Sequence, residues 1–304
     1  MPRSKIIPPY LKPNDNVAII SPSFYVEEEG INMAIEILTG WGLKVKPGRH
    51  VLSRKGPFAG SDEERLSDLQ ESVADASIRA VFCSRGGYGL SRIIDKVDFS
   101  GLIKNPKWYA GYSDATVLHL WLSEKLNLAS LHAEMPAYFR GSGKSHEALN
   151  SLKDALFGDY DSIKWTGNAW KDRSISGEIT GGNISLIYSM AAAGVQLTAR
   201  DKILFLEDTG EYLYHIDRML VSLRKSGLLE GLAALVIGGM SDMINGKNPW
   251  EKSTEETILD IVSKYDYPVV FNFPAGHIQD NRAFYIGRMA RLESFDREHS
   301  LIYH

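Results

Sequence analysis

The chain has 304 residues, 44% of them hydrophobic and 10% aromatic, which is enough apolar sequence for about two globular domains. The net charge of −4 and the scattered lysines and arginines argue against a nucleic-acid-binding protein, so we expect a small partner. The single cysteine, Cys83, excludes an internal disulfide and a cysteine-based metal site. The sequence shows no signal-peptide pattern and no apolar run of about 20 residues, so we expect a cytoplasmic location and no membrane contact.

The first half of the chain alternates predicted strands and helices. Apolar runs predict strands at 16–21, 43–46, 80–83 and from Trp108 onward. Helical spacing of apolar residues predicts helices at 27–41 and after Ser61, which has Glu64 in the position of a capping box. This alternation favours a doubly wound parallel sheet with helices on both faces and an active site at the carboxyl ends of the strands.

Between residues 141 and 168 the pattern loosens into polar, glycine-containing sequence, and we predict a boundary between domains at 1–165 and 166–304. In the second domain strands and helices alternate again, with a turn at Gly181–Asn183. The predicted strands are 174–180, 202–206, 232–238, 269–273 and one or two within 284–295, and the predicted helices are 184–193, 211–226 and 254–265.

Gly111-Tyr112-Ser113-Asp114-Ala115 is a candidate nucleophile turn, in which a strand stops at a serine and a helix begins. Such a turn exposes the serine hydroxyl beside the N–H groups of the helix start. It needs small residues two positions to either side, and Gly111 and Ala115 are small, although Ala115 replaces the second glycine of the G-x-S-x-G pattern. The alternative from this pentapeptide is that Ser113 or Asp114 only caps the helix.

Residues 84–92 form a glycine-containing loop directly after the third predicted strand. Gly86, Gly87 and Gly89 allow close approach of the backbone to a ligand, as half of an oxyanion hole or a phosphate site requires. The loop fails as a dinucleotide signature, because Arg92 stands where the third glycine belongs and no acidic residue closes the preceding strand. A purely structural tight turn is the alternative.

Two further strand ends carry a carboxylate and a histidine that, with Ser113, would make up a serine hydrolase. Glu207 and Asp208 follow a predicted strand, where a carboxylate can orient a histidine or, alternatively, cap a helix or form a salt bridge. His277 lies on a loop shaped by Pro274 and glycine, and histidine can act as base and then acid near neutral pH. A structural histidine is the alternative there, and His132 is the main competitor as base. The sequence has no H-E-x-x-H motif, which disfavours zinc.

Taken in order, these motifs resemble the LD-carboxypeptidase family of serine peptidases, which includes microcin-immunity peptidases. The likeness runs from about Pro13 to Arg291. One segment departs from the family pattern, because His132-Ala133-Glu134-Met135-Pro136 stands where the family has His-Gly-Pro. The motifs that carry the resemblance are Arg85-Gly86-Gly87-Tyr88-Gly89, Gly111-Tyr112-Ser113-Asp114, Leu206-Glu207-Asp208 and Gly276-His277, with supporting matches at 58–65, 177–183 and 214–218.

The resemblance implies a flavodoxin-like, glutamine-amidotransferase-like amino-terminal domain and a swivelling carboxy-terminal β/α domain. It implies a triad of Ser113 as nucleophile, Glu207 as orienting carboxylate and His277 as base. The oxyanion hole would use backbone N–H groups of Gly86 or Gly87 and of Asp114. The resemblance also implies that no metal or other cofactor is needed and that the protein is a homodimer.

The family substrate is the peptidoglycan stem tetrapeptide, which loses its terminal D-alanine by hydrolysis of an L,D-peptide bond. We predict that Arg85, Tyr88 and Arg282 bind the substrate, with an arginine facing its carboxylate. One alternative is a microcin-type peptidase that cleaves aminoacyl-nucleotide conjugates, with Trp165 and Trp170 stacking on the base. Another is a non-catalytic protein that binds a peptide or nucleotide.

Overall fold

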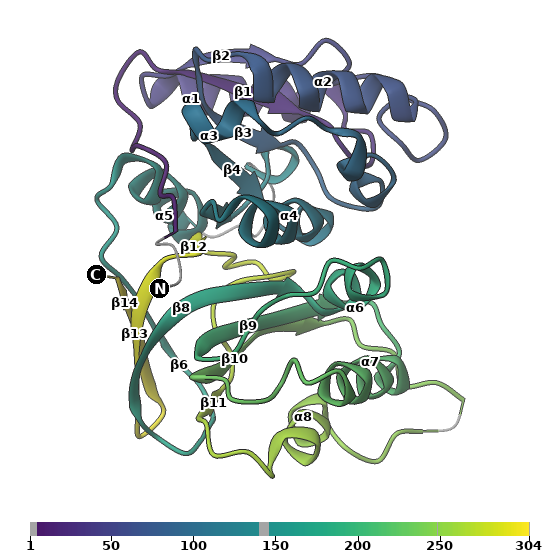
Figure 1. Cartoon of the computed structure of the whole chain (residues 1–304), viewed down its shortest axis with the longest axis vertical. Helices are drawn as coiled ribbons and strands as arrows, with labels where there is room; N and C mark the ends of the chain where they lie inside the picture. The colour runs from purple at the N-terminus through teal and green to yellow at the C-terminus, as the bar shows by residue number, and fades with distance from the viewer. Residues whose placement is uncertain (1–4, 140–145, 248, 304) are drawn as a thin grey trace. The chain divides into compact units, whose positions relative to one another are not determined.

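The computed structural model describes residues 5–139, 146–247 and 249–303, and the chain divides into two compact units (Figure 1). Unit 1 contains Met1–Tyr160 and Gln279–Tyr285, and unit 2 contains Asp161–Ile278 and Ile286–His304. The chain therefore returns to unit 1 for a short segment after most of unit 2. The predicted boundary near residue 165 divides the chain only once, so it assigns this returning segment to the second domain.

Unit 1 is built on a six-stranded sheet in the order β12-β5-β4-β3-β1-β2. The pairs β2–β1, β1–β3, β3–β4 and β4–β5 are parallel, which is the flavodoxin-like order and confirms the predicted fold class. The first strand is apolar and buried from its second residue onward, as expected for a strand covered on both faces. The strands are β1 Asn16–Ile20, β2 Lys44–Pro47, β3 Ile78–Cys83, β4 Trp108–Gly111, β5 Ser130–His132 and β12 Phe284–Ile286.

The helices of unit 1 cover both faces of this sheet. From β1 the chain passes through α1 to β2 at one edge and then through α2 back to β3 on the other side of β1, so right-handed crossovers place α1 and α2 on opposite faces. The predicted capping box is confirmed, because Ser61 caps α2 and accepts a hydrogen bond from Glu64 N–H. The elements are α1 Glu28–Gly40, α2 Asp62–Ala74, α3 Gly101–Lys104, α4 Thr116–Leu126 and α5 His146–Phe157, with short 3₁₀ turns at Leu90–Arg92, Ile94–Lys96, Ser113–Ala115 and Pro136–Tyr138.

Helix α5 corrects the prediction that the pattern loosens after residue 141. Its apolar residues Ala148, Leu152, Ala155 and Leu156 recur at helical spacing and are buried. The polar residues between them and the glycine-containing stretch before them hid this pattern. Residues 140–145, which include that stretch, lie outside the described residues.

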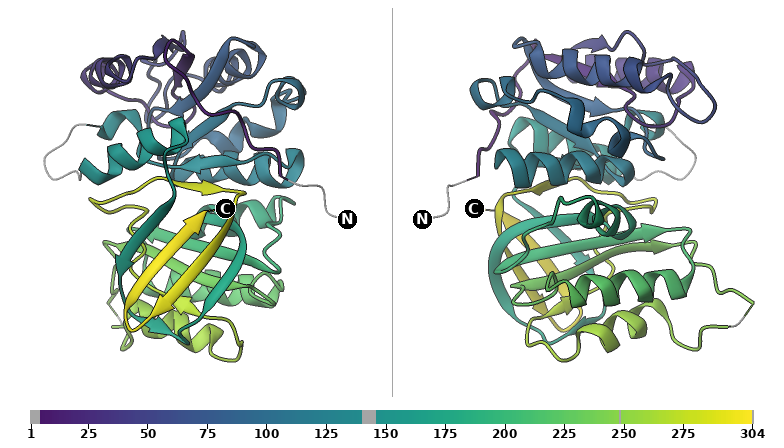
Figure 2. Two further views of the ribbon diagram at one scale, coloured as in Figure 1. Left: turned by 90° about the vertical axis from the view of Figure 1, so that its left-hand side faces the viewer. Right: turned by 45° about the vertical axis from the view of Figure 1, so that its right-hand side comes forward.

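Unit 2 contains an eight-stranded mixed sheet in the order β6-β14-β13-β8-β9-β10-β11-β7. Strands β8 to β11 are parallel neighbours, whereas the pairs β8–β13, β13–β14, β14–β6 and β11–β7 are antiparallel. The hairpin of β13 and β14 is yellow in the left view of Figure 2. The strands are β6 Ser162–Thr166, β7 Ala169–Trp170, β8 Ser174–Asn183, β9 Lys202–Thr209, β10 Ala234–Ser241, β11 Val269–Val270, β13 Met289–Phe295 and β14 Glu298–Tyr303.

Three helices accompany this sheet: α6 Ile184–Ala192, α7 Leu213–Lys225 and α8 Thr254–Val262. Helix α7 packs against both α6 and α8, and the three lie beside the parallel strands in Figure 1. The predicted turn at Gly181–Asn183 is wrong, because β8 continues through Asn183. None of the helices within the described ranges is long and apolar enough to span a bilayer.

Candidate active site

Ser113 lies in a sharp turn between β4 and α4, as predicted. Its φ of 61° is in the left-handed region, which L-residues rarely adopt and which is found at functional turns. A Cβ on Gly111 would lie 2.9 Å from the Cβ of Ala115, so both positions must carry small residues. Neither Ser113 nor Asp114 caps the helix with its side chain, and the capping alternative is therefore wrong.

The glycine loop lies directly against this serine within unit 1. A Cβ on Gly86 would lie 2.8 Å from both Cβ and Oγ of Ser113, so only glycine lets the loop backbone approach the hydroxyl this closely. Gly87 has a φ of 107°, and a Cβ there would overlap the ring of Phe24. The loop backbone thus lies directly beside the hydroxyl of Ser113.

His119, on α4, supports the strand that leads to Ser113. It is fully buried, and burial lowers its pKa to about 4, so its ring is neutral. With the neutral ring, Nε2–H donates to the carbonyl of Gly111 at 2.9 Å and Nδ1 accepts from the Ser130 hydroxyl at 2.8 Å. The sequence indicated only that His119 lies inside a helix, and that position does not predict its hydrogen bonds to Gly111 and Ser130.

In unit 2, His277 pairs with Glu207. The ring Nδ1 of His277 lies 2.7 Å from Glu207 Oε2, and the backbone N–H of His277 donates to the same oxygen at 3.2 Å. The side chain of Glu207 is fully buried, whereas that of His277 is 21% exposed. The carboxylate fixes the Nδ1–H tautomer, so Nε2 is the ring nitrogen that can accept a proton.

Gly276 and Asn183 hold this pair in place. A Cβ on Gly276, whose φ is 107°, would lie 2.8 Å from Glu207 Oε2, so the loop closes tightly over the carboxylate. Asn183 donates from Nδ2 to Glu207 Oε1 at 3.2 Å and to Asp208 Oδ1 at 3.0 Å. Asn183 was predicted only as part of a turn, and its role depends on the pairing of β8 with β9.

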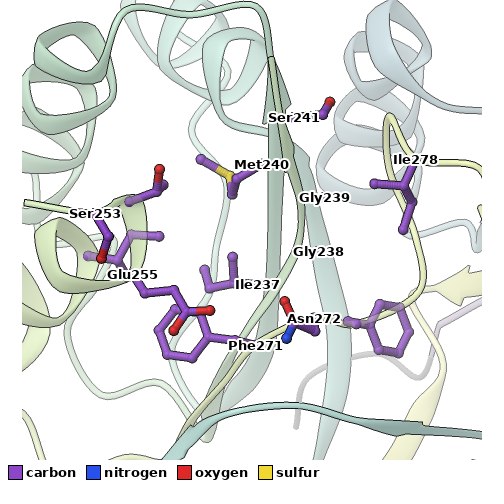
Figure 3. Close-up of a pocket in the computed structure, with 13 residues that line it drawn as sticks. Ile237, Gly238, Gly239, Met240, Ser241, Ser253, Glu255, Phe271, Asn272 and Ile278 are labelled. Atoms are coloured by element: carbon purple, nitrogen blue, oxygen red, sulfur yellow. The ribbon is translucent and has the colours of Figure 1, made fainter. Parts of the chain in front are cut away.

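A pocket of about 630 Å³ opens beside the His277 segment of unit 2 (Figure 3). Its wall includes Gly238 and Gly239 at the end of β10 and Ile278, the residue after His277. Asn272 and Glu255 contribute polar groups to a lining that is otherwise largely apolar. The carboxyl ends of the parallel strands in unit 2 therefore carry both the histidine–carboxylate pair and a concave surface.

The three residues predicted to bind substrate all belong to unit 1 and differ in their partners. Arg85 donates from Nη1 to the carbonyl of Tyr25 at 3.2 Å. Tyr88 is 45% exposed on the glycine loop. Arg282 donates from Nε and Nη2 to Asp280 at 2.7–3.1 Å, so a carboxylate of the chain already faces its charge.

Two of the competing residues considered from the sequence, His132 and Trp165, are buried. His132 is fully buried and stacks on Phe284 with ring centroids 4.7 Å apart, which is a packing environment rather than that of a solvent-accessible base. Trp165 is 9% exposed, and its indole N–H donates to the carbonyl of Phe271 at 3.0 Å. Its ring also packs edge-on against Phe273. Trp165 therefore serves the packing of unit 2.

Unit 1 thus carries Ser113 with the glycine loop, and unit 2 carries Glu207 with His277. A serine in a strained strand-to-helix turn and a histidine oriented by a buried carboxylate are both features of serine hydrolases. Comparison of the sequence with models of protein families identifies one family of such hydrolases. Residues 17–133 match the LD-carboxypeptidase N-terminal domain, and residues 176–292 match the LD-carboxypeptidase C-terminal domain.

Individual relatives agree with these matches over nearly the whole chain. A probable murein peptide carboxypeptidase of Bacillus subtilis is 31% identical, with 95% of this chain and 92% of the relative covered. The murein tetrapeptide carboxypeptidase of Pseudomonas aeruginosa is 28% identical, with 91% and 92% covered. The protein belongs to the LD-carboxypeptidase family of serine peptidases and is a hydrolase.

Solved structures show the same fold. The crystal structure of muramoyltetrapeptide carboxypeptidase from Oxalobacter formigenes has a TM-score of 0.86 and 30% identity, and the match covers 95% of this chain and 99% of that chain. A microcin C7 self-immunity protein in complex with aspartyl sulfamoyl adenosine has a TM-score of 0.88, with 98% and 99% covered. Its identity of 16% shows a shared fold alone.

Proposed function

We propose that this protein is a murein peptide carboxypeptidase that releases terminal D-alanine from peptidoglycan stem tetrapeptides. The observation that carries the proposal is the buried Glu207 carboxylate, 2.7 Å from the ring Nδ1 of His277. It prepares a histidine to take a proton from a serine. Membership of the LD-carboxypeptidase family and the names of the relatives in Bacillus and Pseudomonas support the choice of substrate.

In the proposed mechanism, units 1 and 2 together supply the triad. Nε2 of His277 removes the proton of Ser113 as Oγ attacks the carbonyl of the L,D-peptide bond, and Glu207 stabilises the imidazolium. The C–N bond breaks, His277 gives its proton to the leaving amine, and D-alanine departs. Water, activated by the same histidine, then hydrolyses the ester on Ser113 and restores the free enzyme.

The backbone of the glycine loop stabilises the negatively charged intermediate in this mechanism. N–H groups of Gly86 or Gly87 and of Asp114 stabilise the oxyanion that forms when Ser113 attacks. Next to the scissile bond, the carboxylate of the terminal D-alanine needs a cation. Of the two predicted arginines, Arg85 suits this role better, because Arg282 already faces Asp280. Tyr88, exposed on the loop, completes the proposed binding surface.

The test is release of D-alanine from a purified stem tetrapeptide by the wild type and by Ser113→Ala. We expect turnover by the wild type, loss of at least about 10³-fold in Ser113→Ala, and an unchanged melting temperature. Ser263→Ala, an exposed serine at the end of α8, is the matched control and should retain activity. Turnover by Ser113→Ala at the wild-type rate would show that the nucleophile is assigned wrongly.

The same assay with an aminoacyl sulfamoyl-adenosine tests the microcin-type alternative. That alternative depended on stacking by Trp165 and Trp170, and Trp165 is buried against Phe273. We expect preference for the tetrapeptide. Labelling of Ser113 by a serine-directed reagent would argue against a protein that only binds its ligand.

The family resemblance also leads us to propose a cytoplasmic homodimer. Light scattering of the purified protein should then give about twice the chain mass of 33.9 kDa. A mass of one chain at working concentrations would contradict this part of the proposal.

A further inference from the structure

The side chain of Asp114 joins three segments of unit 1 that are far apart in the sequence. It is fully buried, and its Oδ2 accepts hydrogen bonds from Leu90 N–H at 2.9 Å and from the Ser23 hydroxyl at 2.6 Å. Leu90 lies in the glycine loop directly after Gly89, and Ser23 lies just after β1. One carboxylate oxygen therefore connects the nucleophile turn both to the glycine loop and to the segment that follows β1.

Residues 86–89 of the glycine loop need such an anchor because they have few side chains of their own. Gly86, Gly87 and Gly89 contribute none, and Tyr88 is 45% exposed. Glycine loses more conformational entropy on ordering than any other residue, so holding these residues in one conformation costs more entropy than it would for other residues. Backbone contacts therefore contribute much of their order, and the hydrogen bond from Leu90 N–H to the carboxylate is one of them.

A second backbone contact leads to the same carboxylate. Phe24 N–H donates to the carbonyl of Gly86 at 3.3 Å, and the ring of Phe24 lies where a side chain on Gly87 would be. The neighbouring Ser23 is held by its hydrogen bond to Asp114. Gly86 and Leu90, on either side of Gly87–Gly89, are thus both connected to Asp114, directly for Leu90 and through the Ser23–Phe24 segment for Gly86.

We propose that Asp114 is a positioning residue that fixes the glycine loop relative to Ser113, so that the oxyanion donors are in place before the substrate arrives. The inference rests on the proposed function of this loop. A Cβ on Gly86 would lie only 2.8 Å from Ser113 Oγ, so a small shift of the loop changes the geometry around the reacting carbonyl. Donors that are already ordered stabilise an oxyanion without reorganisation during the reaction.

The experiment compares Asp114→Ala and Asp114→Asn with a matched control, Asp68→Ala. Asp68 is also a buried carboxylate of unit 1, and it accepts a backbone hydrogen bond from His50 at 2.9 Å instead of one from the loop. The measurements are kcat and KM for release of D-alanine and hydrogen exchange of peptides covering residues 84–92.

For Asp114→Ala we expect kcat to fall about 10- to 100-fold with little change in KM, because oxyanion donors act mainly in the transition state. Exchange at 84–92 should become faster. Asp114→Asn keeps a carbonyl oxygen for Leu90 and Ser23, so it should restore most of kcat and of the protection from exchange. Asp68→Ala should change neither kcat nor exchange at 84–92.

An Asp114→Ala protein with wild-type kcat and wild-type exchange would overturn the inference, as would an equal loss of kcat in Asp68→Ala. If Asp114→Ala does not fold, Ser23→Ala removes one of the two donors and should give a smaller increase in exchange; unchanged exchange there would also overturn it. A wild-type protein that releases no D-alanine would contradict the proposed function instead, and faster exchange at 84–92 in Asp114→Ala would still support the anchoring role.

Discussion

The adjacent carboxylates Glu207 and Asp208 have different surroundings at the end of β9. Glu207 accepts from the ring and the backbone N–H of His277, whereas Asp208 accepts from the hydroxyl and N–H of Ser185. Burial, followed by the charge of Glu207, raises the pKa of Asp208. The sequence pattern left open which carboxylate faces the histidine, and only the family resemblance chose Glu207. The choice depends on the path of the 274–277 loop, which no local pattern encodes.

We expect Asp114 to make the stability of the protein depend on pH. Burial raises the pKa of its carboxyl from 3.8 to about 6, although Leu90 N–H, the Ser23 hydroxyl and the charge of Arg65 act in the opposite direction. The folded state therefore favours the protonated acid. The stability contributed by this group is fully present below about pH 3.8 and is lost as the pH rises through about 6, a difference of about 3 kcal/mol.

Asparagine does not titrate, so Asp114→Asn should gain stability relative to the wild type as the pH rises. We expect the difference in unfolding free energy to move by about 3 kcal/mol in favour of the variant between about pH 4 and pH 7.5. Urea denaturation at a series of pH values measures this difference. The nearby thiol of Cys83 stays neutral over this range, because burial raises its pKa to about 12. A difference that does not vary with pH would refute the prediction.

At the scale of elements, the glycine loop is shaped by its contact with the nucleophile turn. Gly86→Ala would place a methyl group 2.8 Å from Ser113 Oγ, and it should lower kcat by about 100-fold while changing the melting temperature little. The matched control is Gly40→Ala at the end of α1, where a Cβ meets no atom within 4 Å. That control should keep full activity and gain up to about 1 kcal/mol of stability. A wild-type kcat in Gly86→Ala would show that the backbone of the glycine loop takes no part in the reaction at Ser113.

Sequence periodicity located most of the helices and strands, and its errors have physical causes. Gly181 and Gly182 suggest a turn, yet they lie within β8. Glycine is required at position 181 because a side chain there would overlap the carbonyl of Phe205 on β9. Here glycine permits close approach of two strands rather than a change of direction. Helix α5 was missed because its buried positions are mostly small, with Ala148, Ser151 and Ala155 among them. A stripe of small residues gives a weak apolar signal.

At the scale of the molecule, periodicity could not predict the return of Gln279–Tyr285 to unit 1. The segment is short, it follows the loop of His277, and its strand β12 pairs at the edge of the sheet of unit 1. Contacts with α5 hold it there: Ala283 N–H donates to the Ser151 hydroxyl at 2.8 Å. Such contacts join residues more than 100 positions apart, so they are visible only in the folded chain.

Tyr285 is the residue that anchors this returning segment. It is fully buried, its hydroxyl donates to the carbonyl of Ala155 at 2.7 Å, and its ring packs on Trp108 with centroids 5.4 Å apart. Tyr285→Phe should therefore cost about 1 kcal/mol of unfolding free energy and speed hydrogen exchange at 279–285. Tyr267→Phe is the matched control, because that buried tyrosine donates to the carbonyl of Leu229 within unit 2. It should cost a similar free energy and leave exchange at 279–285 unchanged; equal exchange in both variants would mean that the segment is held by other contacts.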